Sequence, residues 1–391
     1  MRNEINSVKS IRAIVRVVVI VLIVVEFGFN VSTRADSLYI GDLIDDTVKA
    51  FDALTGEFQG LFVKKEAKGK IRDPQGLIFN PEGNLLLANQ NEGTQKAGEI
   101  RKHDGATGAF LGALVSHSDK NAPFVPRGIV LLKGIVPEKD VLFVADITVK
   151  GKNAPPGRLL EYTGQGVFLA DLTPDHDTFP GTKSQDEFHA RGLVVGPDGL
   201  LYVSVCDDLD PTSADFNPLP GWILRFDPKT GAFVDVIASY NNLYPTAVTC
   251  ADLHRPDGLA FGPDGRLYVT AFRANGSDTD KILIVAPPPP THPQNGKWTF
   301  IGKIDLDQVD NDPDHDQPRA FAQALLFGPG GSLFVPIAGN GPDTGSVRQY
   351  DAVTKKYTIF VPASGNGGAL GVPEYLTFGN TDPATLAYQS Q

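Results

Sequence analysis

Six polar residues stand at matching points of a repeated apolar pattern. Each directly precedes the first glycine, or its replacement, of an apolar run that a turn joins to a second apolar run, as in HRPDGLAFGPDGRLYVTAF at 254–272. The six residues are Gln75, Arg127, Arg191, Asp257, Gln323 and Glu374. Two guanidiniums can hold a carboxylate or phosphate through paired hydrogen bonds.

The repeat predicts the elements that position these residues. Its first glycine, or what replaces it, recurs every 50 to 66 residues or so, a period typical of propellers and solenoids. One copy contains the runs GLVV, LLYVSV, WILRFD and GAFVDVIA, joined by turns such as GPDG and DPKTG. Four antiparallel strands per copy make one propeller blade. Segments with helical periodicity are lacking after the N-terminus, so we expect an all-β protein.

The two ends of the repeat region complement each other. Residues 37–63 read as the second, third and fourth strands of a blade, whereas PEYLTFGN at 373–380 reads as a first strand alone. Pairing these strands would remove two open sheet edges. The sequence therefore predicts a six-bladed β-propeller, formed as one domain over residues 36–391 and closed by strands from both ends.

The six polar residues should form a ring at one mouth of the central channel. Each begins the innermost strand of its blade, on the face that carries the long connections 147–158, 207–221, 273–281 and 307–319, where binding residues usually lie. Two interpretations stay open at this point. The ring either contacts a ligand, or its two arginines and two acids neutralise one another and close the channel.

The motif PDGLAFGPDGRLYVT, followed by the I-x-R-F-D-x-x-T-G-x-F pattern, resembles NHL-repeat propellers and the related gluconolactonase/regucalcin-type propellers. The resemblance covers about residues 38–380 and implies six blades. Such relatives hold a divalent cation at the mouth with a Glu, an Asp and Asn side chains, and Glu374 and Asp257 match the two acids. Arg127 and Arg191 stand where the relatives have Asn, and a guanidinium cannot ligate a metal. Virginiamycin B lyase-type propellers share the repeat and use His, Glu and Mg²⁺, but their WFTE-like strand ends are absent here.

Two further groups could do chemistry. His189 and His254 lie two and three residues ahead of their ring positions and could act as catalytic acid or base near neutral pH. A run of alternate acids occurs in the connection DLDQVDNDPDHDQ, at Asp310, Asp312, Asp314 and Asp316. It either binds Ca²⁺ or is a solvated acidic loop, and it departs from the EF-hand pattern.

The N-terminus and the cysteines concern localisation. A basic stretch, the apolar run VVVIVLIVV and small residues before Asp36 are typical of a signal peptide over residues 1–35, with a membrane anchor as the alternative. A secreted or periplasmic location would allow Cys206 and Cys250 to form a disulfide, although two buried thiols are also possible. A formal charge of −11 disfavours nucleic acid as a partner.

These observations favour a secreted NHL-type propeller that binds a small anion or a polypeptide at the channel mouth. The protein is expected to be a monomer with no integral membrane span after signal cleavage. The alternative is a gluconolactonase-like hydrolase or a virginiamycin B lyase-like enzyme, with a divalent metal on Asp257 and Glu374.

Overall fold

The computed structural model describes most of the chain. The described residues are 36–65, 71–94, 96–136, 139–147, 157–175, 188–206, 219–275, 277–289, 297–306 and 320–389. They belong to Ala35–Gln391, the second of two compact units, the first being Met1–Arg34. The predicted signal peptide (1–35), the acidic run 310–316 and most of the long connections lie outside the described residues. Within the described part, no helix combines the length and the apolarity needed to cross a bilayer.

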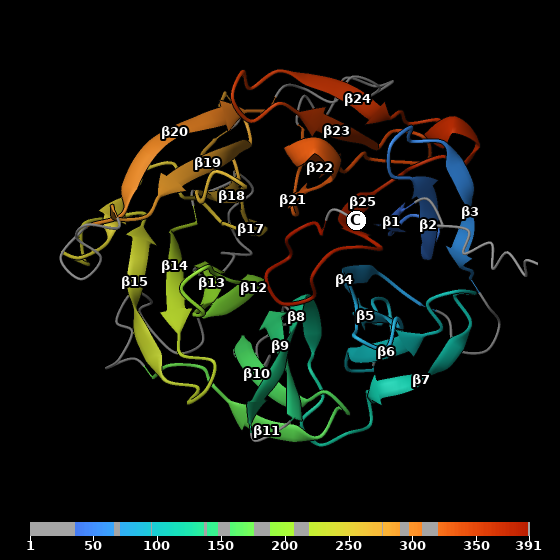
Figure 1. Cartoon of the computed structure of the whole chain (residues 1–391), viewed down its shortest axis with the longest axis horizontal. Helices are drawn as coiled ribbons and strands as arrows, with labels where there is room; N and C mark the ends of the chain where they lie inside the picture. Colours follow the sequence, from blue (N-terminus) through green and yellow to red (C-terminus); the bar gives the residue numbers. More distant parts are fainter. Residues whose placement is uncertain are drawn as a thin grey trace, which may run out of the picture. The chain divides into compact units, whose positions relative to one another are not determined.

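Six antiparallel sheets surround a common centre, as Figure 1 shows, and confirm the predicted six-bladed propeller. We number the blades from the N-terminus and give the strands from the innermost outward. Blade 1 contains β25 (Pro373–Phe378), β1 (Ser37–Asp42), β2 (Thr47–Asp52) and β3 (Phe58–Val63). Blade 2 contains β4 (Pro74–Phe79), β5 (Leu85–Asn89), β6 (Glu99–His103) and β7 (Phe110–Val115). Blade 3 contains β8 (Val125–Val136), β9 (Lys139–Ile147), β10 (Arg158–Thr163) and β11 (Phe168–Asp171).

Blades 4 to 6 follow the same order. Blade 4 contains β12 (His189–Val195), β13 (Leu201–Cys206), β14 (Gly221–Phe226), β15 (Phe233–Ser239) and β16 (Val248–Thr249). Blade 5 contains β17 (Leu259–Phe261), β18 (Leu267–Ala271), β19 (Lys281–Ala286) and β20 (Thr299–Asp305). Blade 6 contains β21 (Leu326–Phe327), β22 (Leu333–Ile337), β23 (Ser346–Tyr350) and β24 (Tyr357–Val361). Two short 3₁₀ turns are η2 (Pro329–Gly331) and η3 (Gly365–Gly367). The strand β16, which pairs parallel with β15, was not expected from the repeat.

Blade 1 is closed by strands from both ends of the repeat region. The strand β1 pairs antiparallel with β25, from Leu38 opposite Phe378 to Asp42 opposite Pro373. This confirms the predicted closure. Because the first and last strands of the repeat region then share one sheet, β1 has a partner on each side and blade 1 has the four strands expected of a blade.

The core lies between the blades. Each of the six hydrophobic clusters joins the facing sides of two neighbouring blades, around the whole ring. The innermost strand β4 is buried at every residue, whereas the outermost strand β7 has three exposed residues and only one buried residue among its six. Strands buried on both faces read as continuous apolar runs, and strands with one solvated face alternate. This is why the apolar frame of the repeat is uniform.

In blades 1, 2 and 4 an Asp-x-x-Thr-Gly turn joins the third and fourth strands. In blade 1, the Asp52 carboxylate accepts hydrogen bonds from the backbone N–H groups of Leu54 and Thr55, at 2.9 Å each. The turn ends on Gly56, whose φ of 71° favours glycine. Blade 6 places Lys355 at this point with a φ of 61°, so the turn there carries backbone strain.

Candidate functional site

The six ring residues of consecutive blades lie side by side at one mouth of the channel. A Cβ added to Gly128 would lie 2.6 Å from the carbonyl oxygen of Arg191, and one added to Gly76 would collide with that of Arg127. The glycine of one blade therefore touches the ring residue of the next. The glycine after the ring residue in blades 2 to 5 follows from this close approach, because a side chain there would strike the neighbouring strand. Blades 6 and 1 have Ala324 and Tyr375 at this point instead.

Arg191 forms an ion pair with Asp257, one of the two acids of the ring. Its Nε and Nη2 lie 2.9 and 2.7 Å from Oδ2 of Asp257, and both residues are buried, with exposed fractions of 2% and 0%. The Tyr375 hydroxyl donates to the other Asp257 oxygen at 3.2 Å. Arg191 and Asp257 therefore neutralise each other, as one of the two interpretations of the ring had expected for its two arginines and two acids.

Arg127 reaches across the channel. Its Nη1 donates to Oε1 of Gln323 on the opposite blade and lies 3.6 Å from Asp257 Oδ2 and 3.7 Å from Glu374 Oε2. Burial alone would lower the pKa of Arg127, but the carboxylates of Asp257 and Glu374 outweigh burial and raise it. Gln75 donates from Nε2 to Glu374 Oε2 at 2.9 Å. The ring is therefore one connected polar network.

The two carboxylates proposed for a metal are already in contact with arginines. Arg191 binds Asp257, and Arg127 lies beside both Asp257 and Glu374. In the described part of the chain, no group of three His, Cys, Asp or Glu side chains has a geometry that could hold a metal ion. A cation between these two acids would meet guanidinium charge on both sides, so the donor set does not fit a divalent metal.

Arg255, which the sequence analysis missed, is a third guanidinium at the mouth. Burial and the charges of Arg191 and Arg127 lower the pKa of Arg255 to about 9. Its guanidinium lies 4.4 Å above the ring of Phe272, and its buried Nε has no hydrogen-bond partner. The residue has a φ of 39°, and strained backbone of this kind clusters at functional sites.

Asp73 is a second residue that the sequence analysis missed. Burial, followed by the Glu374 charge and a hydrogen bond with Glu92, raises the pKa of Asp73 to about 8. Asp73 is therefore largely protonated at pH 7, although it accepts a hydrogen bond of 3.0 Å from Gln75. Like Arg255, it stands two residues ahead of a ring position and has a positive φ, 58°. His189 shares this register, so inspecting that register in every repeat could have found both residues.

The two histidines lie in different surroundings. His189 starts β12 opposite Cys206, and burial with the charges of Arg191 and Arg255 lowers its pKa to about 4. His254 packs against Tyr240, with ring centroids 4.9 Å apart, and burial with the charge of Lys281 lowers its pKa. His189 belongs to the mouth and is neutral at pH 7. A catalytic role for either histidine stays a prediction.

The predicted disulfide between Cys206 and Cys250 is not formed, and both side chains are buried. Cys206 ends β13, whereas Cys250 follows β16 and donates its N–H to Ser239 of β15 at 2.8 Å. The strands β14 and β15 therefore separate the two cysteines. Adjacent strands are about 4.8 Å apart, so three such steps exceed the roughly 7 Å between Cα atoms that a disulfide can span. The prediction was wrong because the chain passes along the outside of blade 4 before it enters blade 5.

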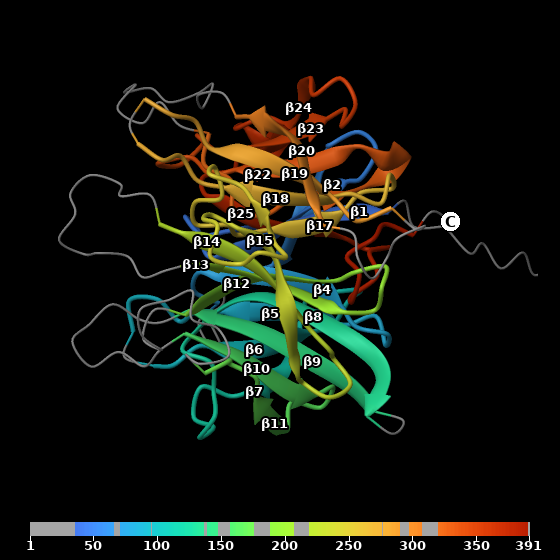
Figure 2. The ribbon, with the colours of Figure 1, turned by 90° about the vertical axis from the view of Figure 1, so that its left-hand side faces the viewer.

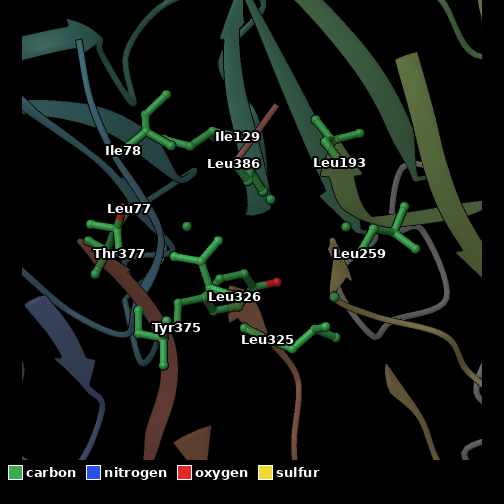
Figure 3. A pocket seen from close by; sticks show the side chains of 16 residues that line it. Leu77, Ile78, Ile129, Leu193, Leu259, Leu325, Leu326, Tyr375, Thr377 and Leu386 are labelled. Atoms are coloured by element: carbon green, nitrogen blue, oxygen red, sulfur yellow. The ribbon is translucent and has the colours of Figure 1, made fainter. Parts of the chain in front are cut away.

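Below the ring, the channel contains a small apolar cavity of about 40 Å³ (Figure 3). Its walls are the innermost strands, and Leu386 lines it as well. Leu386 belongs to the segment after β25, whose carbonyls Pro383 O and Ala384 O accept hydrogen bonds of 2.9 Å from Leu131 N of blade 3 and Val195 N of blade 4. Figure 2 shows this segment on one side of the ring. The mouth opposite the polar ring is thus covered by the protein's own C-terminal segment.

Comparisons with known proteins yield structural similarity only. No family model matches the chain, and no curated protein matches it. Among solved structures, the periplasmic gluconolactonase PpgL of Pseudomonas aeruginosa is similar over 88% of this chain and 98% of that one, with 17% identity and a TM-score of 0.49. A protein from Bacteroides uniformis, described as a candidate 6-phosphogluconolactonase, has 13% identity and a TM-score of 0.46 over 88% and 99% of the two chains. A protein of unknown function from Dyadobacter fermentans has 12% identity and a TM-score of 0.47 over 83% and 85%. These similarities do not transfer a function to the chain.

Proposed function

We propose that this propeller binds a small anion at the polar mouth of its channel. The observation that carries the proposal is Arg255, a partly buried arginine whose buried Nε has no hydrogen-bond partner and which lies near two further arginines. A buried donor without a hydrogen-bond partner destabilises the folded protein. For a guanidinium, a carboxylate or phosphate is the acceptor that offsets this penalty best.

The charges at the mouth support the same proposal. Arg127, Arg191 and Arg255 face two acids, Asp257 and Glu374, while Asp73 keeps its proton up to about pH 8. With both acids ionised, one positive charge is left uncompensated. A bound monoanion would balance it, whereas a divalent cation would add to it.

We further propose that binding takes place outside the cytoplasm, in the periplasm or after secretion. Residues 1–35 have the pattern of a signal peptide, and the mature domain would begin at Asp36. Mass spectrometry of the protein recovered from the periplasm or medium tests this, since an intact N-terminus in the membrane fraction would contradict it.

Isothermal titration with small carboxylates and inorganic phosphate at pH 7, in the presence of EDTA, tests the binding function. For the anion that binds, we expect Arg255→Met to weaken the binding free energy by about 1.5–3 kcal/mol, the range for a hydrogen bond to a charged group. Arg266→Met is the matched control, because Arg266 is half-exposed and pairs with Asp264 on a tight turn. If no anion binds, and Ca²⁺ instead stabilises the protein in a way that Asp257→Ala abolishes, the metal-dependent alternative is favoured.

A further inference from the structure

Gln75 and Arg127 converge on one carboxylate oxygen at the mouth. Gln75 Nε2 lies 2.9 Å from Glu374 Oε2, and Arg127 Nη1 lies 3.7 Å from the same atom. Gln75 and Arg127 come from neighbouring blades and are more than nine-tenths buried, with exposed fractions of 0% and 8%. Their side chains therefore meet in a part of the site that solvent barely reaches.

Each of these two side chains leaves one buried polar atom without a hydrogen bond. On Gln75 it is the acceptor Oε1, and on Arg127 it is the donor Nε. The other polar atom of the Gln75 amide is engaged twice, with Asp73 and with Glu374. Both carboxyl groups are acceptors for an amide N–H, so this contact orients the amide and directs Oε1 away from them. Since both side chains reach Glu374 Oε2, the unpaired acceptor and the unpaired donor belong to the same part of the mouth.

We infer that Gln75 and Arg127 select an oxyanion that keeps a proton on one oxygen, namely hydrogen phosphate or a phosphomonoester monoanion. Such an ion donates its P–OH hydrogen to Gln75 Oε1 and accepts from Arg127 Nε through an unprotonated oxygen. Sulfate and ionised carboxylates have only acceptors, so they would place a lone pair against Gln75 Oε1. This inference rests on the proposed anion-binding function and narrows its ligand.

Competition between phosphate and sulfate tests the selection, because the two ions have the same tetrahedral shape. We expect inorganic phosphate to bind the unmodified protein at least about 30-fold more tightly than sulfate at pH 7, since a site built around a buried hydrogen bond rejects an analogue that lacks the group. Equal binding of the two ions would overturn the selection and leave the anion-binding function intact. Failure of both ions and of all carboxylates to bind would overturn both proposals.

Comparing phenyl phosphate with inorganic phosphate distinguishes a phosphomonoester from free phosphate as the ligand. A phosphomonoester loses its second proton near pH 6, whereas inorganic phosphate still carries a proton at pH 7. The monoester should therefore bind about tenfold more weakly, relative to sulfate, at pH 7 than at pH 5. Sulfate corrects for the protein's own titration, which in this range involves Glu374, whose pKa burial raises, while His189 stays neutral and Asp73 stays protonated. Arg127, Arg255 and the Tyr375 hydroxyl, which also face the site, have pKa values above this range. Arg191 and Asp257 face the site as well. A monoester affinity that does not change relative to sulfate would contradict the inference.

Substitutions assign the selection to Gln75. Gln75→Met keeps the shape of the side chain but removes its acceptor, and we expect the phosphate-to-sulfate ratio to fall to within about threefold of one. Gln323→Met is the matched control, since Gln323 Oε1 is already occupied by Arg127 and Arg191. In that variant both ions should bind more weakly and the ratio should persist. A ratio that survives Gln75→Met would overturn the inference, and if that variant does not fold, the measurements on the unmodified protein decide.

Discussion

The two ends of the channel are built from the same six strands in opposite ways. At one end, the strands begin with polar residues whose charges form a buried network, such as the Arg191–Asp257 pair with Nη2 and Oδ2 2.7 Å apart. At the other end, the strands are covered by an apolar side chain, Leu386, which packs against four of the six inter-blade clusters. Between these ends lies the cavity of about 40 Å³.

The difference shows how one scaffold separates stability from recognition. A leucine closes its end without any choice of partner, because apolar contact is not directional. A charged network closes its end only if every group finds a partner, and the mouth leaves the Nε atoms of Arg127 and Arg255 and the Oε1 atom of Gln75 without one. The end with unmet hydrogen bonds is therefore the one to which we assign the proposed anion binding.

The largest expected effect concerns the charged end. Arg191→Met removes the shorter of the two ion pairs of the fully buried Asp257 and leaves only Arg127, 3.6 Å away; breaking a buried pair costs about 3–5 kcal/mol of unfolding free energy. Urea denaturation measures the loss. The double variant Arg191→Met/Asp257→Leu should recover most of it, because no buried charge then lacks a partner. A loss below about 1 kcal/mol would mean that the pair does not hold this end closed.

The next effect concerns pH at the same end. The carboxyl pKa of Asp73 is raised to about 8 in the folded state from an ordinary value of 3.8. The stabilising contribution of its proton is therefore complete below about pH 4 and is lost as the pH rises towards 8. Each pKa unit corresponds to about 1.4 kcal/mol, so Asp73→Asn, which mimics the protonated form and tolerates the positive φ, should gain about 2 kcal/mol or more at pH 8.

Denaturation of both Asp73 proteins at pH 5 and pH 8 checks this prediction. At pH 5 the two proteins should differ less than at pH 8. A pH-independent difference would show that Asp73 is ionised throughout the range. Because an ionised Asp73 would also remove the uncompensated positive charge, anion binding to the unmodified protein should weaken above pH 8.

A smaller effect is expected at the apolar end. Leu386→Ala removes contacts to four clusters, but the side chain is only partly buried, so we expect a loss of about 1–2 kcal/mol, below the range for fully buried leucines. Leu54→Ala is the control, because Leu54 is 73% exposed. Anion affinity should be unchanged in Leu386→Ala, and a large change would mean that the two ends are coupled.

The smallest effect concerns the cysteines. Because β14 and β15 separate Cys206 from Cys250, a reducing agent should leave the free energy of unfolding unchanged within about 0.5 kcal/mol. Two thiols should titrate in protein denatured without a reductant. A single disulfide found by mass spectrometry would contradict the structure here.

Much of the fold could be predicted from local pattern. The strand β12 begins close to the expected run GLVV, and β25 pairs with β1 as the split repeat required. The repeat also placed Gln75, Arg127, Arg191, Asp257, Gln323 and Glu374 at one level of the channel. These features follow from periodicity and turn chemistry, which act over a few residues and recur in each copy.

The contacts of those residues, on which their proposed role rests, are not contained in any local pattern. Nothing near Arg191 in the chain indicates that Asp257, 66 residues later, would take up its guanidinium. Arg255 and Asp73 became candidates only when burial and neighbouring charges shifted their pKa values. The cover of Leu386 and the separation of Cys206 from Cys250 likewise arise from the path of the chain between blades.

By itself, the sequence determined the blades, their number, their closure and the ring of polar positions, because the period of apolar residues and the turns specify a β-sheet repeat wherever they occur. Only the tertiary structure decided which charges are paired and which hydrogen bonds are unmet. Those outcomes depend on distances of 3–4 Å between residues from different blades and on the exclusion of water, and electrostatic energies change steeply with both.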